Sequence, residues 1–459
     1  MNDAAASHPV QATVVDFINA TNAFDIERAL ALFSTTAVID DPSTGCTFNE
    51  HAGVRDYLEK YFLGYHTVTR LLSLEGLGDV RARARVDFTG DFGHEIGLLL
   101  VALDPAGLIS RIDAALEWGG EEHIMKTLMI YGASGYTGRM AAAHAEEAGL
   151  KLVLAGRDEA PLQALAKRLG VEYRVFALDN AGDVDYGLQD ITVLLNCAGP
   201  FAHTAGALME ACLRGGVHYL DIAAELDSYQ LAERHDLSAT EAGVMLMPGS
   251  GGSVAMLGSL AARAVERVPS PVSIRIALHV AGSMSRGSAI SASQHVTVQC
   301  LMRRDDVLTA HAPDVLQDLD FGNGLVSCFP VTLPDLITIA RQTGVGDIET
   351  YVHVSGSAFP EGGIDALPDG PTAQERADNR YQAAVEVVGA DGAITRAVLD
   401  TVNGYSFTPL AAVVAARRVL AGEARPGFHT PVGVFGSDFA ETIADTRITF
   451  IDPATPTPR

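Results

Sequence analysis

The sequence feature that most constrains the fold is a strand, a glycine-rich turn and a helix in direct succession. The apolar run 127–131 leads into Gly132-Ala133-Ser134-Gly135-Tyr136-Thr137-Gly138, and a helical stretch, 139–148, follows. Glycines in such a turn allow a sharp bend, leave room for a pyrophosphate and let the helix pack closely on the strand. The N–H groups that open the helix favour an anion. We therefore predict dinucleotide contacts at Gly132, Ser134, Gly135, Tyr136, Thr137 and Gly138.

The second strand, 151–155, indicates which dinucleotide is bound. It ends in Gly156-Arg157-Asp158, where the adenosine ribose is expected. A guanidinium at this place matches a 2′-phosphate, so Arg157 indicates NADP rather than NAD, unless it is simply a surface arginine in a turn. Asp179 follows the third strand, 173–178, and either meets the adenine or starts a turn.

The fourth strand, 191–195, is expected to lead to the nicotinamide. It ends in Asn196-Cys197-Ala198-Gly199-Pro200. Ligands of open parallel sheets bind outside the carboxyl ends of the strands. Asn196, Gly199 and Pro200 are therefore expected to border the nicotinamide ribose.

Two or three domains are expected, because 459 residues exceed the roughly 250–300 that one core supports. Strand-like and helix-like segments alternate from 127 to 268, which indicates a parallel sheet with crossover helices. From residue 271 longer strands indicate a largely antiparallel sheet, and a helix at 409–421 returns the chain to the nucleotide domain. We assign a Rossmann NADP-binding domain to 126–270 and 404–459, and a substrate-binding or dimerisation α/β domain to 271–403.

The N-terminal segment differs from the rest. Helical patterns come first and alternating strands afterwards, which predicts a separate α+β domain at 1–118, joined by the linker 119–125. Asp113 lies mid-strand between Ile112 and Ala114; if it faced an apolar cavity, its proton affinity would rise and it could shuttle protons, but alternation also allows the wet face. The other polar residues that could line a pocket are Asp40, Asp41, His51, His66, Asp87 and His94.

Bulk composition restricts partners and compartment. The formal net charge of -25 makes nucleic acid and anionic membrane surfaces poor partners. The five cysteines are scattered, with no Cys/His cluster at metal-ligand spacing, so we expect reduced thiols and no metal. No signal peptide or membrane span is recognisable, and the chain is expected to be soluble and cytoplasmic.

In its glycine-rich turn and in the strand ends that follow it, the chain resembles the saccharopine dehydrogenase-like superfamily. The resemblance is to its NADP-binding reductases in particular, including the trans-acting enoyl reductases. The matching pieces are the turn 132–138, Ala155-Gly156-Arg157, the turn 196–200, and His218-Tyr219-Leu220-Asp221 with Glu225. Weaker matches are Ser285-Arg286-Gly287-Ser288 and Gly404-Tyr405. The resemblance implies a Rossmann domain with an inserted α/β substrate domain. The family's glycine-phenylalanine-aspartate turn is replaced here by 248–253, which has no aspartate.

Residues 14–118 resemble the SnoaL-like members of the nuclear-transport-factor-two-like α+β cone, on their helix pattern, strand order and Ala37-Val38-Ile39-Asp40-Asp41-Pro42. That family includes isomerases, cyclases and dehydratases of hydrophobic carbonyl compounds, as well as domains with no catalysis. Cone domains often pair through their sheets, so the resemblance implies a homodimer.

Hydride transfer also needs a proton donor or acceptor. No tyrosine is followed by a lysine four residues later, which excludes the short-chain dehydrogenase mechanism. Tyr405 and His203 are the candidate donors, and Ser285 and Arg286 could polarise an oxygen or, for Arg286, clamp an anionic group. Structural alternatives are a packed tyrosine, a helix-start histidine and a solvated turn. Asp221 and Glu225 either bind ribose or substrate or form a strand-end and cap pair.

The leading hypothesis is an NADP-dependent reductase of a C=C or C=O bond in a hydrophobic carbonyl compound. The N-terminal domain would assist by isomerisation, cyclisation or substrate capture. Two alternatives remain: an isomerase or cyclase in which the N-terminal domain is the catalyst and the Rossmann domain is regulatory, and a non-enzymatic NADP-sensing scaffold.

Overall fold

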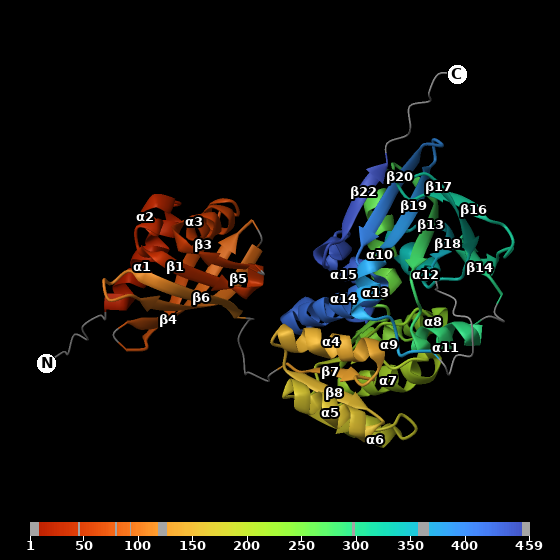
Figure 1. The fold of residues 1–459 in the computed structure, drawn as a ribbon, viewed down its shortest axis with the longest axis horizontal. Coiled ribbons are helices and arrows are strands. Elements are labelled where there is room, and N and C mark those ends of the chain that lie inside the picture. Colours follow the sequence, from red (N-terminus) through yellow and green to blue (C-terminus); the bar gives the residue numbers. More distant parts are fainter. Residues whose placement is uncertain are drawn as a thin grey trace. The chain divides into compact units, whose positions relative to one another are not determined.

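The computed structural model describes residues 9–44, 46–78, 80–91, 93–117, 126–295, 299–356 and 367–451. The chain divides into two compact units, Met1–Ile124 and Met125–Arg459. The predicted linker, 119–125, lies outside the described residues. Each unit is described by itself (Figure 1).

The first unit is a mixed sheet with helices packed on it. Two helices, α1 (Pro9–Asn22) and α2 (Ile26–Leu30), precede the strands, and α3 (Glu50–Tyr57) follows the first hairpin. The sheet order is β2-β1-β6-β5-β4-β3, in which only β1 and β6 pair in parallel. The strands are β1 (Phe33–Asp41), β2 (Cys46–Asn49), β3 (Val68–Gly76), β4 (Arg81–Gly90), β5 (Gly93–Leu103) and β6 (Ile109–Glu117).

Alternation of side chains fixes which face of this sheet is buried. In β4 the residues Ala82, Ala84 and Val86 are inaccessible to solvent, whereas the arginines between them lie on the other face. The three apolar residues pack with Val14 and Phe17 of α1 in one core. The α+β domain expected from the sequence is confirmed.

The second unit begins with a seven-stranded parallel sheet of order β21-β12-β11-β10-β7-β8-β9. Its strands are β7 (Leu128–Tyr131), β8 (Leu152–Gly156), β9 (Glu172–Val175), β10 (Val193–Asn196), β11 (His218–Asp221), β12 (Met245–Met247) and β21 (Gly427–Phe428). Because β7 has β8 on one side and β10 on the other, the strand order reverses between β7 and β10. Dinucleotides bind at such a point.

Helices cover both faces of the parallel sheet, so that its central strands, such as β7 and β10, are buried along their whole length. The helices are α4 (Tyr136–Glu147), α5 (Glu159–Leu169), α6 (Ala181–Gly187), α7 (Phe201–Gly215), α8 (Leu226–Arg234), α9 (Asp236–Glu241), α10 (Gly252–Val265) and α14 (Gly404–Arg418). The Rossmann architecture predicted from the sequence is confirmed.

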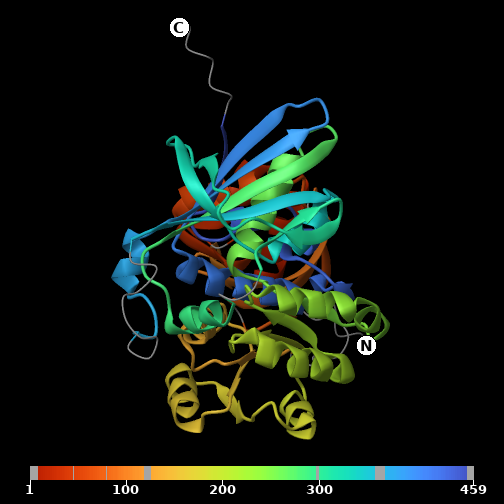
Figure 2. The same cartoon turned by 90° about the vertical axis from the view of Figure 1, so that its right-hand side faces the viewer.

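A second sheet in this unit has the path β15-β14-β18-β13-β19-β20-β22, with the hairpin β16–β17 joined at β18. Among the described strands of this sheet, only β13 and β18 pair in parallel, so the sheet is largely antiparallel, as predicted. Figures 1 and 2 show the two sheets at opposite ends of the unit. The strands are β13 (Pro271–Ala281), β14 (Leu301–Arg304), β15 (Val307–Ala310), β16 (Gln317–Asp320), β17 (Leu325–Pro330), β18 (Asp347–Ser355), β19 (Tyr381–Gly389), β20 (Ile394–Thr401) and β22 (Arg447–Ile451).

The end of the chain corrects one predicted boundary. The sequence assigns all of 404–459 to the Rossmann domain, but β22 pairs with β20 in the antiparallel sheet, while β21 pairs with β12 in the parallel one. The shorter helices of this region are α11 (Arg286–His295), α12 (Asp335–Thr343), α13 (Ala373–Asp378) and α15 (Pro431–Phe435). Within the described ranges, no helix is both long enough and apolar enough to cross a bilayer.

Candidate functional site

The turn between β7 and α4 has the shape of a phosphate cradle. Gly132 has φ +78°, and a Cβ there would lie 2.7 Å from the backbone nitrogen of Ala198. At Gly138 a Cβ would lie 2.3 Å from the Gly132 carbonyl oxygen. Gly135 is exposed, with only that oxygen within 4 Å of a Cβ placed on it. The outer two glycines therefore let the turn close, and the middle one leaves its surface open to a ligand.

The first turn of α4 adds positive charge to this cradle. It contains no acidic residue, and Tyr136 and Thr137 open the helix. Arg139 donates from Nη1 to the Ser134 carbonyl at 2.7 Å, so a guanidinium that the sequence analysis did not single out lies beside the turn. The glycines, the helix N-terminus and this arginine together fit a pyrophosphate.

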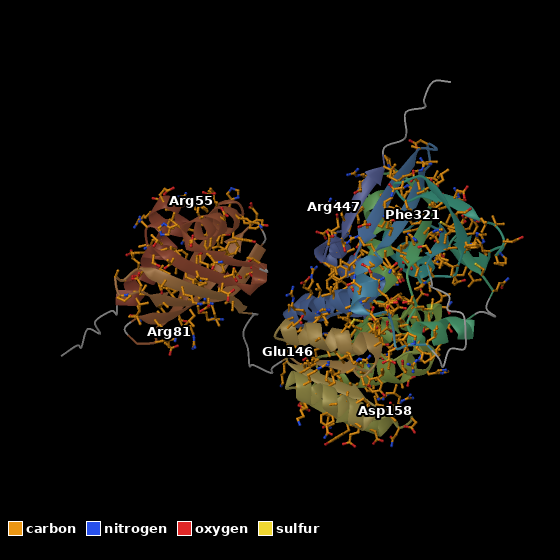
Figure 3. The ribbon with its side chains drawn as sticks, viewed as in Figure 1. Arg55, Arg81, Glu146, Asp158, Phe321 and Arg447 are labelled. Atoms are coloured by element: carbon orange, nitrogen blue, oxygen red, sulfur yellow. The ribbon has the colours of Figure 1, made fainter. Side chains whose placement is uncertain are left out.

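The expected ribose contacts lie at the same edge of the sheet. Arg157 is 80% exposed and its nearest carboxylate, on Asp158, is 3.7 Å away. Figure 3 labels Asp158 beside α5, the helix that it precedes. Burial raises the pKa of Tyr131, at the end of β7, to about 12, and the charges of Arg157 and Asp179 also act on this hydroxyl. The exposed guanidinium of Arg157 fits a 2′-phosphate.

Asn196, which is expected to border the nicotinamide ribose, is buried beneath the turn rather than exposed at the edge of the sheet. Its side chain is buried and donates to Thr204 Oγ1 at 3.1 Å and to the Tyr219 hydroxyl at 3.2 Å, while its Oδ1 accepts from the Ala198 N–H at 2.9 Å. Asn196 therefore shapes the turn, whereas Gly199 is exposed and Pro200 is partly exposed.

Asp221 connects two neighbouring strand ends. Its side chain is inaccessible to solvent, and its Oδ1 accepts from the N–H groups of Ala223 and Gly249, at 2.9 and 2.8 Å. Its backbone carbonyl accepts from the Ser250 hydroxyl at 2.8 Å. Asp221 thus holds the turn 248–253 from a neighbouring strand. Glu225 precedes α8 at its N-terminal cap position and is also buried.

We predict that the Asp221 carboxyl makes stability depend on pH. Burial raises its pKa from 3.8 to about 6 in the folded protein, so between these values the folded state binds more protons than the unfolded state. The free energy of unfolding then falls as pH rises from 3.8 to 6, by about 3 kcal/mol in total. In denaturant unfolding, the free energy of unfolding of Asp221→Asn should rise relative to that of wild type as pH rises across this window. A gap that is independent of pH would contradict the prediction.

Tyr405 and the Ser285–Ser288 segment meet next to the nucleotide turn. The Tyr405 hydroxyl donates to Ser288 Oγ at 2.9 Å and accepts from the Ser285 N–H at 2.9 Å, and Ser285 Oγ donates to Ser288 Oγ at 3.0 Å. The Tyr405 ring packs edge-to-face on Tyr136 of α4, with centroids 5.7 Å apart. The structure therefore brings together Tyr136, Tyr405 and Ser285, and adds Ser288, which the sequence analysis did not single out.

Arg286 opens α11 beside this cluster and is already paired. Its Nη2 donates to Asp369 Oδ1 at 2.8 Å and its Nε donates to the Leu367 carbonyl at 3.0 Å. Arg286 therefore lies at the surface, as in a solvated turn, but its guanidinium is held in an ion pair.

His203 lies near the turn 196–200, where the nicotinamide is expected, and it is not among the residues that contact Tyr405. It is exposed in the first turn of α7, and its backbone N–H donates to the Pro200 carbonyl at 3.1 Å. The position is the helix start that the sequence predicts, next to the turn 196–200. Its exposed ring is free to meet a ligand that approaches this edge of the sheet.

Asp113 is corrected by the structure, because its side chain does not face an apolar cavity. It is 41% exposed and pairs with Arg111, whose Nε donates to Asp113 Oδ1 at 2.7 Å, whereas its neighbours Ile112 and Ala114 point into the core. Alternation in β6 therefore places Asp113 on the wet face. Asp40 also pairs with Arg111. Three other polar candidates of this unit bond elsewhere: His51 with Phe33, His66 with Asp91, and Asp87 with Arg70.

The first unit nevertheless contains a pocket of about 260 Å³ with acidic groups in its wall. Tyr57 donates from its hydroxyl to Asp41 Oδ2 at 2.7 Å, and Ser43 donates to Asp41 Oδ1 at 2.6 Å. Burial, together with the Asp41 charge, raises the pKa of Glu95. The aromatic residues in the wall are Tyr57, Tyr61, Phe62, Tyr65 and Phe88. Of the two acidic groups in the pocket wall, the sequence analysis named Asp41 but not Glu95. The side chain of His94, another residue expected there, is not among the side chains that the structure describes.

Comparisons with known proteins agree with the geometry of the second unit. Residues 128–247 match the family model described as the saccharopine dehydrogenase NADP binding domain. A saccharopine dehydrogenase-like oxidoreductase of Rattus norvegicus is 27% identical over 144 residues, which cover 27% of this chain and 34% of the relative. The chain thus matches about a third of the length of that relative.

Two solved structures can be set beside the two units. Apo saccharopine dehydrogenase (L-Glu forming) from Saccharomyces cerevisiae has a TM-score of 0.51 at 11% identity, over 71% of this chain and 100% of that one, which shows a shared fold. An NTF2-like protein of unknown function from Cytophaga hutchinsonii has a TM-score of 0.22 at 13% identity, over 25% of this chain and 94% of that one. A score of 0.22 does not bear on function.

The strand order, the glycine cradle and the family match agree on one domain. Residues 128–247 are similar to the saccharopine dehydrogenase NADP binding domain, and NADP is the cofactor of this chain.

Proposed function

We propose that this chain is an NADPH-dependent oxidoreductase, of the trans-acting enoyl reductase type, that reduces a C=C or C=O bond of a hydrophobic carbonyl compound. The observation that carries the proposal is the hydroxyl cluster of Tyr405, Ser285 and Ser288, which packs through Tyr136 against the cofactor turn. A cytoplasmic homodimer is part of the proposal, on the composition and the resemblance given above.

The chain's own residues supply orientation and a proton. Bound NADPH supplies a hydride. The Tyr405 hydroxyl gives its proton to the substrate oxygen. For a C=O bond, this proton and the hydride together complete the addition to an alcohol. For a C=C bond conjugated to a carbonyl, the hydride adds to the β-carbon and the proton on oxygen gives an enol, which then tautomerises with solvent to the saturated carbonyl compound. The Ser285 N–H, 2.9 Å from the Tyr405 oxygen, stabilises the tyrosinate that remains, and the Ser288 hydroxyl beside it passes a proton back from solvent.

The proposal is tested by following the hydride itself. NADPH deuterated at both C4 positions is incubated with the full chain and a panel of hydrophobic enones and ketones, and the products are analysed by mass spectrometry. We expect one deuterium on carbon in the product and no transfer from deuterated NADH at equal concentration. Oxidation of NADPH without deuterium in any product would contradict a reductase.

The N-terminal pocket supports the second part of the proposal, in which this domain assists by isomerisation, cyclisation or substrate capture. Glu95, with its raised pKa, and Asp41, which accepts three hydrogen-bond donors, are two carboxyls in unlike environments. Such a pair suits one group to give a proton and the other to take one. The aromatic wall suits an apolar substrate.

We therefore expect Asp41→Asn to slow proton exchange at the carbon next to the carbonyl of a bound hydrophobic ketone. The loss should be about 10²-fold, the usual contribution of a positioned base. Deuterium uptake from D₂O, followed by NMR without NADP, measures it. Asp113→Asn, on the wet face of the same domain, is the matched control. Equal losses of exchange rate in both variants, or no loss in Asp41→Asn, would contradict a catalytic role of the pocket.

A further inference from the structure

A short segment of the substrate domain lies against the cofactor turn. We call residues 367–372 the strap. A Cβ on Gly370 would lie 2.7 Å from the Tyr136 ring, and the Tyr136 hydroxyl donates to the Pro371 carbonyl. Arg376 donates from Nη1 both to the Tyr136 hydroxyl, at 2.7 Å, and to the Pro371 carbonyl, at 2.9 Å. The strap is therefore fastened to the first turn of α4, where the pyrophosphate is expected.

The strap brings one carboxylate to two guanidinium groups. Asp369 Oδ2 accepts from Arg139 Nη2 at 3.1 Å, and its Oδ1 accepts from Arg286 Nη2 at 2.8 Å. The side chains of Arg139, Asp369 and Arg286 are 39, 56 and 41% exposed, so a dissolved ligand can reach them. Because Arg139 also bonds the Ser134 carbonyl, a single side chain separates Asp369 from the nucleotide turn.

We propose that Asp369 is an internal anion that competes with a phosphate of the cofactor for Arg139, so that the strap restrains access to the nucleotide site. The helix N-terminus and Arg139 attract an anion, and Asp369 already neutralises part of that attraction. The two phosphates of a pyrophosphate beside the turn bear two negative charges together, against one on a carboxylate, and so displace Asp369 from Arg139. The inference rests on the proposed function, since it concerns the same nucleotide site.

Release of Asp369 also affects the contacts of Tyr405, the proposed proton donor. Asp369 holds Arg286, the first residue of α11, and the residue before it, Ser285, donates its N–H to the Tyr405 hydroxyl. The strap thus connects the cofactor turn to the Tyr405 cluster through neighbouring hydrogen bonds.

The test is the affinity of the full chain for NADPH and NADH, measured by calorimetry at low ionic strength. Asp369→Asn keeps the size of the side chain and removes its charge, and it should tighten binding about threefold to fivefold, the size of an exposed ion pair. Tightening of both nucleotides identifies the pyrophosphate as the competing group, and tightening of NADPH alone identifies the 2′-phosphate. Asp378→Asn, whose carboxylate bonds only Gln374 among the contacts described, is the matched control.

A double-mutant cycle makes the test specific. In the Arg139→Gln background, Asp369→Asn should no longer change the affinity, because the contested group is gone. An unchanged or weaker affinity of Asp369→Asn, or an effect that persists without Arg139, would overturn the inference. Inorganic pyrophosphate serves as a second probe. If wild type binds neither nucleotide, the proposed function fails. The inference is then tested separately by whether Asp369→Asn tightens the binding of pyrophosphate.

Discussion

Tyr405→Phe is expected to lower kcat by about 10²- to 10⁴-fold, the usual contribution of a proton donor placed at the reacting group. The substitution removes the hydroxyl that donates to Ser288 but keeps the ring that packs on Tyr136, so NADPH affinity should stay unchanged. Steady-state kinetics on a substrate found in the deuterium assay give kcat and KM, and a titration gives the affinity for NADPH.

The control for this substitution is Tyr173→Phe, which removes a hydroxyl that bonds Gln163 at the far edge of the parallel sheet. It should leave kcat unchanged. If Tyr405→Phe keeps full activity, the proton comes from elsewhere, and His203 becomes the next candidate. A fall in NADPH affinity that matches the fall in activity would instead indicate a structural role for Tyr405.

Arg157→Ala is expected to raise the Kd for NADPH by about 10- to 150-fold, which corresponds to the roughly 1.5–3 kcal/mol of a hydrogen bond to a charged group. The Kd for NADH should not change, because NADH has no 2′-phosphate. The guanidinium is 80% exposed, so its removal should not affect the fold. Calorimetric titration with both nucleotides measures the selectivity directly.

Arg168→Ala, in the last turn of α5, is the matched control for charge alone. It should change neither Kd. If Arg157→Ala weakens NADPH and NADH alike, Arg157 acts on the pyrophosphate or on general charge, and the assignment of the 2′-phosphate to this residue is wrong.

The shape of the turn between β7 and α4 could be predicted from the sequence because its constraints are local. Gly132 and Gly138 belong to one short turn, and each excludes a Cβ for reasons that the strand-turn-helix pattern already implies. The same holds for the alternation in β4, where a period of two separates a buried face from an exposed one.

What the sequence could not show depends on contacts between distant residues. Asp113 could have pointed either way, because a period of two is symmetrical until the helices that cover one face are known. Asp369 meets Arg139 across 230 positions in the chain, and Tyr57 meets Asp41 across 16, with no pattern that joins them. β22 returns to the antiparallel sheet for the same reason, since its partner β20 is distant along the chain.

The measurement that tests the central claim most directly is a titration of the purified chain with NADPH and with NADH, followed by the fluorescence of the nicotinamide. The account predicts that NADPH binds, and binds more tightly than NADH, because we expect the cradle at Gly135 to hold a pyrophosphate and Arg157 to hold the 2′-phosphate. If neither nucleotide binds, or if NADH binds more tightly, the claim of an NADPH-dependent reductase is contradicted.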